Sequence, residues 1–536
     1  MIKKTILATA LAAVAIGSAQ ANTVYIGGSS AFRKTAAAAL AGAGWSYVAN
    51  DGSSLTDVGG THVLYSKNGD YISTCWSGSE AGVQSVCAGT NSRALGFFAT
   101  NATGNVKAFA SDGKTVTNNA IPTIVTNADA AFSDCSATIS RWNGLKNSKE
   151  LINGLSVVVN YVKPSLSTNV GVQSFTFLAS ENFPTNKATS ISANAAKVLF
   201  EKGQIPLSLI TGDSNDATAT IWLTGRNPDS GTRITAFNET GYGALKATMN
   251  YKVTKTDTNA KTITELTLYP TNVINGLVTA PGDDGQSSGG TLVGSIAPLD
   301  ANLVVYGPAT NTVISVVYTN FTGTNIFTNT VKGTSASVNG GVYNGALSTS
   351  PVAPATAAVV TTNAAGSATA YASYKYVYYY IATNLYTNVT PPTIAGTLAG
   401  TNGKSTNLVA FPVTVPSSSN YLVTYASVGD AITKSTLSSN YPVLLNYNGD
   451  GIQGSSIADT NAQATAKSLI QSKIKNGSYT FWNYEYALLS TNAQAGASSV
   501  FNAIVTATVP TVAAPNAKVS DLNVTRADGG ATIYNK

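Results

Sequence analysis

The fold is decided by the stretch VYIGGSSAFRKTAAAALAG (24–42), which reads as a strand, a turn and a helix in immediate succession. Residues 24–26 are a short apolar strand. Gly and Ser fill the turn at 27–30, and both residue types are common where a strand ends and a helix begins. An alanine-rich helix is predicted over 31–41, with Gly42 placed to stop it.

The same order of elements occurs twice more in the chain. SGSE (77–80) precedes a helical segment that runs to Val86, and IWL (221–223) leads through RNPDSGT (226–232) into a predicted helix over 234–242. Strands that alternate with helices at this spacing indicate parallel sheets. The sequence therefore predicts an α/β protein.

These turns have the chemistry of anion-binding sites. The first turn of a helix presents unpaired N–H groups and the positive end of its dipole, and Gly lets a ligand approach the backbone. Ser and Thr hydroxyls add donors, and the guanidinium of Arg226 can hold two oxygen atoms at once. A single Ser turn is weak evidence, because Ser is also a good helix cap. Three such turns, one of them with an arginine, favour an anion site.

The N-terminus predicts export. Lys3-Lys4 precede an apolar run over 6–16 and the small-residue ending at 19–21, which is the layout of a secretory signal peptide over residues 1–21. The apolar run is too short for a membrane span, and no Cys follows the cleavage site to carry a lipid. We therefore expect a periplasmic or secreted protein.

Composition excludes several classes of function. The chain has 536 residues, of which 43% are hydrophobic and only 10% are charged, and its net charge of +6 is not gathered into a basic cluster. Nucleic acid is therefore not an expected partner. His62 is the only histidine, so zinc sites with several His ligands are excluded, and we interpret His62 as structural. We predict no enzyme, no cofactor and no metal.

The three cysteines leave two alternatives open. Cys75 and Cys87 are twelve residues apart and could form a disulfide in an oxidising compartment, with Cys135 unpaired. The other possibility is three buried thiols.

Four segments resemble the periplasmic phosphate-binding proteins of ABC importers and their relatives in the type II solute-binding family. IGGSSAF (26–32) is similar to the first ligand loop of that family, and SGSEAGV (77–83) to the second. TNADAAFS (126–133) resembles the segment that carries the family's ligand-binding Asp. Arg226 with SGT (230–232) matches the Arg and Ser-Gly-Thr loop, which is the most specific of the four.

The resemblance implies a fold and a mechanism. The fold would be the two-lobed type II periplasmic-binding-protein fold with mixed sheets, and the lobes would close on phosphate or a similar oxyanion for uptake by an ABC importer. Asp129 would be the one acceptor and would select protonated phosphate over sulfate; a helix-capping role is its alternative. The protein is expected to be a monomer. The implied ligand residues are Ser29, Ser30, Phe32, Ser79, Asp129, Arg226, Ser230, Gly231 and Thr232.

The predicted domain division follows the same resemblance. Lobe one comprises 22–150 with 445–536 returning to it, and lobe two comprises 151–298 with 419–444. Residues 299–418 lie outside the resemblance, are rich in Thr and Asn, and read as short strands between turns. We predict an inserted domain of the β-sandwich type there.

Two other functions remain open at this stage. One is an extracellular structural or adhesion protein that reuses the binding-protein fold, which the large uncharged insertion favours. The other is a secreted phosphatase with a Ser nucleophile. It is disfavoured because no base or metal cluster can be named near Ser30 or Ser230.

Overall fold

The computed structural model describes most of the chain after residue 21. The predicted signal peptide lies outside the described residues. No helix among them is both long and apolar enough to cross a bilayer. The described residues are 22–87, 92–109, 113–140, 162–257, 262–270, 273–274, 277–278, 280–296, 313–319, 325–332, 337–338, 341–342, 359–362, 368–372, 378–381, 412–414, 419–435, 442–452, 460–494 and 496–536.

Thirteen strands form one mixed sheet, and its first half is built around β1 (Thr23–Gly28). This strand pairs in parallel with β4 (Asp70–Cys75) on one side and with β8 (Ala130–Ser133) on the other. The carboxyl ends of all three strands therefore meet at one edge of the sheet. The strands beyond β4 are β3 (His62–Lys67), β2 (Ser46–Asn50) and β6 (Gly104–Asn105).

Helices cover both faces of this half. Val24 and Ile26 lie in one apolar cluster with Leu40 of α2 and Ile504 of α10, whereas Tyr25 lies in the other cluster with Val83 of α3. This alternation is the period of two that a strand imposes on its side chains. The run of apolar residues in β1 is thus explained by burial on both sides. The helices are α2 (Arg33–Gly42), α3 (Ser79–Cys87) and α10 (Ala497–Thr511).

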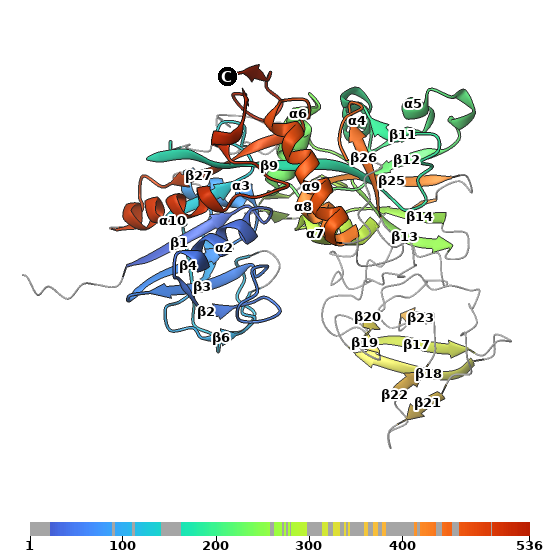
Figure 1. The fold of residues 1–536 in the computed structure, drawn as a ribbon. Coiled ribbons are helices and arrows are strands. Elements are labelled where there is room, and N and C mark those ends of the chain that lie inside the picture. The colour runs from blue at the N-terminus through green and yellow to red at the C-terminus, as the bar shows by residue number, and fades with distance from the viewer. Residues whose placement is uncertain are drawn as a thin grey trace, which may run out of the picture.

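One long strand, β9 (Leu166–Ala179), joins the two halves of the sheet. Residues 166–174 pair antiparallel with β27 (Trp482–Leu489), and residues 175–179 pair with β25 (Asn420–Ser427) and β26 (Val443–Tyr447). In Figure 1, β9 runs between the blue strands of the first half and the strands of the second. The predicted α/β architecture is confirmed. These antiparallel strands make the large sheet mixed, as the resemblance implied, whereas the alternation of strands and helices alone predicts parallel sheets.

The second half places one further helix opposite the starts of α2 and α3, because the strand before this helix runs antiparallel to β1. β12 (Thr220–Leu223) runs parallel to β25, and α6 (Gly231–Glu239) follows it after a short turn. Ser230 caps α6, because its Oγ accepts the Arg233 backbone N–H at 3.2 Å. The other elements here are β10 (Ser190–Ile191), α4 (Ala193–Lys202), β11 (Gln204–Pro206), α5 (Ser208–Thr211), α7 (Gly289–Ile296), α8 (Val428–Ser435) and α9 (Thr460–Lys475).

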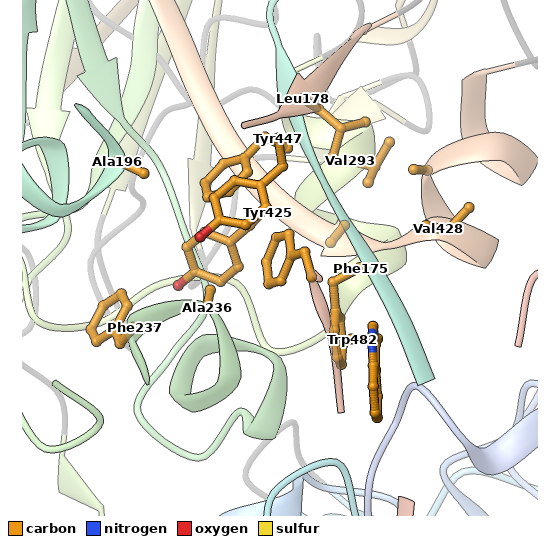
Figure 2. Close-up of a cluster of buried hydrophobic side chains, with 14 of the residues drawn as sticks. Phe175, Leu178, Ala196, Ala236, Phe237, Val293, Tyr425, Val428, Tyr447 and Trp482 are labelled. Atoms are coloured by element: carbon orange, nitrogen blue, oxygen red, sulfur yellow. The ribbon is translucent and has the colours of Figure 1, made fainter. Parts of the chain in front are cut away.

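An aromatic core fixes α6 against the sheet. The ring centroids of Phe200 and Phe237 are 4.6 Å apart, and the ring of Tyr425 packs edge-on against Phe200 at 5.5 Å. On β9, Phe177 packs against Phe481 at 5.1 Å. Figure 2 shows Phe237 and Tyr425 in this cluster, on α6 and β25. Such pairs each add about 0.5–1.5 kcal/mol beyond burial, so they hold the start of α6 in place.

In the predicted insertion, every described residue belongs to a strand. None of these strands pairs with the large sheet. β17 pairs with β18 and β23, while β24, within the predicted range, pairs with β14, which precedes it in the chain. The strands of this region are β17 (Val313–Thr319), β18 (Asn325–Lys332), β19 (Ser337–Val338), β20 (Gly341–Val342), β21 (Val359–Thr362), β22 (Ala368–Ala372), β23 (Tyr378–Ile381) and β24 (Pro412–Thr414). Small peripheral strands are β5 (Leu95–Phe98), β7 (Thr123–Thr126), β13 (Tyr251–Asp257), β14 (Thr262–Leu268), β15 (Val273–Ile274), β16 (Leu277–Val278), β28 (Val524–Thr525) and β29 (Tyr534–Asn535).

The possible disulfide between Cys75 and Cys87 is wrong for this structure, in which both thiols are free and buried. Cys75 ends β4, whereas Cys87 ends α3, which packs back along β1 and β8. The nine residues of that helix carry Cys87 about 12 Å from its start. Two sulfur atoms must come much closer than this to bond.

Gly28 is required where β1 turns into the first loop. Its φ is +133°, and a Cβ there would collide with the carbonyl oxygen of Phe132 on β8. We expect Gly28→Ala to lower the free energy of unfolding by about 2 kcal/mol or more in denaturant titrations. Gly42→Ala is the matched control, because a Cβ at Gly42 meets no atom within 4 Å, and it should not destabilise. Equal stability of the two variants would contradict this account of the turn.

Candidate functional site

The first turns of α3 and α6 meet directly, where the carboxyl ends of strands from the two halves of the sheet face each other. The Glu80 backbone N–H donates to the Asp229 carbonyl at 3.0 Å, and the Gly78 N–H donates to the Gly28 carbonyl at 2.9 Å. A Cβ on Gly231 would overlap the Ser79 side chain, so only Gly allows α6 to start this close to α3. Three loops that are distant in the sequence are therefore in contact.

Asp134, directly after β8, is the centre of these contacts. Its carboxylate accepts hydrogen bonds from three hydroxyls, one from each loop: Ser29, Ser79 at 3.1 Å and Thr232 at 3.0 Å. Its backbone carbonyl accepts from Asn483 Nδ2 at 2.9 Å. The Asp134 side chain is thus buried and held from several directions.

Arg226 brings a buried positive charge to the same place. Its Nε donates to the Gln286 carbonyl at 3.0 Å, and its Nη2 donates to the Ser287 carbonyl at 2.9 Å and to Ser30 Oγ at 3.4 Å. Among the described residues, Nη1 has no hydrogen-bond partner. Burial lowers the pKa of Arg226, while the carboxylates of Asp134 and Asp430 oppose that shift. An arginine nonetheless stays charged near neutral pH.

A buried ion pair joins the two halves of the sheet next to this point. Arg93 Nη1 lies 2.6 Å from Asp229 Oδ2, and both side chains are buried. Asp229 belongs to the loop between Arg226 and Thr232, so Arg93 supports that loop from the first half. Both charges are desolvated. Removing one of them would therefore leave the other buried without a counter-ion, which would destabilise the fold.

The structure brings most of the predicted ligand residues together. Ser29, Ser79 and Thr232 converge on Asp134, Gly231 lies against Ser79, and Ser30 contacts Arg226. The other two have packing and capping contacts. Phe32 is buried and its ring lies 5.8 Å from that of Phe132, while the hydroxyl of Ser230 caps α6.

Asp129 does not join this group. Its carboxylate accepts the backbone N–H groups of Tyr25 and Gln494, each at 2.9 Å, and so ties β1 to the segment after β27. It precedes β8, whereas Asp134 follows it, and an extended strand separates the two by about 16 Å. Asp129 therefore lies apart from the converging hydroxyls, and Asp134 is the carboxylate that they contact. The sequence could have pointed to Asp134, because this residue directly follows a strand and ligands bind at the carboxyl ends of parallel strands.

His62 lies away from this site and has its own partners. Its Nδ1 is 2.7 Å from Asp51 Oδ2, and its ring stacks on Phe109 with centroids 4.1 Å apart. Burial alone would lower its pKa, but Cys75 and Asp51 outweigh burial and raise the pKa to about 10. No group of three potential metal ligands occurs within the described part of the chain.

Comparisons with known proteins add little. No family model and no curated protein matches the chain. Among solved structures, it is similar to "a possible phosphate binding protein from Planctomyces limnophilus DSM 3776", with 11% identity and a TM-score of 0.20. The match covers 42% of this chain and 54% of that one, or about half of its length. This likeness is too weak to bear on fold or ligand.

His62 gives a direct test of its structural role, because the chain has one histidine and therefore one imidazole signal. We expect that signal to show no titration between pH 5 and 8 by NMR, since the folded pKa of about 10 exceeds the ordinary 6.5. A raised pKa stabilises the fold fully below about pH 6.5, and this stabilisation is lost as the pH rises toward 10. His62→Gln should lack that part of the pH dependence. An imidazole that titrates near pH 6.5 would contradict the contact with Asp51.

Proposed function

We propose that the chain binds a small tetrahedral oxyanion, with phosphate as the leading candidate, where α2, α3 and α6 begin. The observation that carries this proposal is the convergence of Ser29, Ser79 and Thr232 on one point beside the buried Arg226. Hydroxyls, helix N-termini and a guanidinium are the donors that suit a compact anion.

The donors can change partner without moving the backbone. In the structure the three hydroxyls donate to Asp134, and each can rotate about one bond to donate to an anion instead. In the first turns of α3 and α6, the Glu80 N–H donates to the Asp229 carbonyl and the Arg233 N–H donates to Ser230 Oγ, so the hydroxyls are the donors that this exchange uses. The helix dipoles and the charge of Arg226 add electrostatic attraction, which is strong because the surroundings are buried.

Asp134 would supply selectivity. A carboxylate facing an anion is repulsive unless a proton lies between the two, so it favours phosphate, which carries an O–H group near neutral pH, over sulfate, which does not. In this proposal Asp134 takes the role that the sequence assigned to Asp129. It is well placed for that role, since the three donor hydroxyls already surround it.

The biological setting is part of the proposal. The signal-like residues 1–21 support export to the periplasm or the exterior, and an exported binding protein of this kind would deliver its anion to an ABC importer. We propose a monomer that binds its ligand without chemical turnover. The long strand β9 supports such a mechanism, because a strand shared by both halves of the sheet can transmit a change in their relative orientation.

Removal of Arg226 tests the site. We expect the parent protein to bind phosphate with a Kd in the micromolar range or below, equivalent to about −8 kcal/mol or better, in calorimetric titrations with phosphate, arsenate, sulfate and molybdate. Arg226→Ala should raise the Kd for phosphate about tenfold or more. Lys187→Ala is the control, because Lys187 is a largely exposed cation paired with Asp216. If Arg226→Ala binds phosphate like the parent, the site is wrong.

The preference for phosphate over sulfate distinguishes the roles of Asp134 and Asp129. Asp134→Asn replaces an acceptor by a donor, so we expect the preference for phosphate over sulfate to fall about tenfold or more. Asp129→Asn should keep the preference and lower only the unfolding temperature, because Asp129 accepts backbone N–H groups. Both ratios come from the same paired titrations. The opposite pattern would return the acceptor role to Asp129.

A further inference from the structure

A second buried carboxyl group interacts with Asp134. Glu485 is on β27, two residues after Asn483, whose side chain donates to the Asp134 carbonyl at 2.9 Å. The Glu485 side chain is fully buried, and it interacts with the carboxyl group of Asp134. Neither Glu485 oxygen receives a hydrogen bond from any donor among the described residues.

Among the described residues, the cation bonded to β27 is Arg526, which donates to the Trp482 carbonyl at 2.9 Å and is paired with Glu239 rather than with Glu485. The strands beside it, β9 and β8, carry no titratable side chain, and neither does α10, which packs on β27. On α3, the carboxylate of Glu80 accepts from Ser140 Oγ at 3.1 Å, and Cys87 lies at the far end of the helix. Asp134 is thus the charged group that Glu485 faces.

An ionised Glu485 would be very costly in this position. A buried carboxylate needs donors or a counter-ion, and two adjacent carboxylates cannot both ionise. A carboxylic acid that donates its one proton to Asp134 has no such need, which accounts for the lack of donors at its own oxygens. In agreement, burial raises the pKa of Glu485 well above its usual range, and the charge of Asp134 raises it further.

We propose that Glu485 is a protonated acid that donates a hydrogen bond to Asp134, and that the two carboxyl groups act as one proton-sharing unit that determines which anions the site accepts. This inference rests on the proposed oxyanion function. With one proton and one negative charge, the pair keeps Asp134 as an acceptor toward the ligand and requires a ligand that brings its own O–H group.

Glu485 is a positioning and specificity residue in this scheme. Its proton would occupy an Asp134 lone pair that the three hydroxyls leave to it. The hydroxyls of Ser29, Ser79 and Thr232 are then free to exchange Asp134 for an anion. The proton of Glu485 would then compensate part of the negative charge of Asp134, which the three hydroxyls compensate in the structure.

The first measurement needs no ligand. Difference infrared spectra of the full chain at neutral pH should contain a carboxylic acid C=O band that is lost in Glu485→Gln. Glu201→Gln is the control, because Glu201 is exposed and its pKa is lowered by Lys202, and it should leave the band unchanged. Persistence of the band in Glu485→Gln would overturn the proposal, whether or not the protein binds phosphate.

The second measurement concerns selectivity. Glu485→Gln keeps a donor toward Asp134, so phosphate affinity should remain within about twofold of the parent.

Glu485→Leu removes the donor and should reduce the preference for phosphate over sulfate about tenfold or more, with folding checked by circular dichroism. Parent-like selectivity in a folded Glu485→Leu would overturn the proposal. Failure of every variant and the parent to bind any oxyanion would instead overturn the proposed function.

Discussion

The carboxylate of Asp134 is the point on which the arrangement of this protein depends. Three hydroxyls from three loops donate to it, and each loop joins the carboxyl end of a strand to the start of a helix. A buried carboxylate is stable only when donors surround it, so the loops must meet for Asp134 to be tolerated at all. The same requirement that stabilises the fold therefore gathers the donors that an anion would use.

Two contacts of buried arginines link the two halves of the sheet at this site. Arg93 of the first half binds Asp229 of the second, and Arg226 of the second half reaches Ser30 of the first. Each of these charges is buried, so each is specific in its geometry and costly to separate from its partner. Glu485 is the member without a cation, and a bound proton is the simplest way to accommodate it.

The long strand β9 makes these contacts possible. Its first residues pair with β27 and its last residues with β25 and β26, so one strand fixes the distance between the loops that end β1 and β12. The interior on the second side is aromatic, and the packing of Phe237 against Phe200 sets where α6 begins. A shift of α6 by one residue would move Thr232 away from Asp134.

The sequence by itself determined the local units and the kind of chemistry. The apolar strand at 24–26, the Gly/Ser turns and the loop from Arg226 to Thr232 are short-range signals, because a few adjacent residues fix strand, turn and cap. Only the tertiary structure decided which carboxylate faces the hydroxyls and which residues pair. Asp129 and Asp134 flank the same short strand, and strand pairing places the latter at the edge where the helices begin. The free thiols, the ion pair of Arg93 with Asp229 and the position of Glu485 likewise depend on contacts between residues far apart in the chain, which no local pattern of residues encodes.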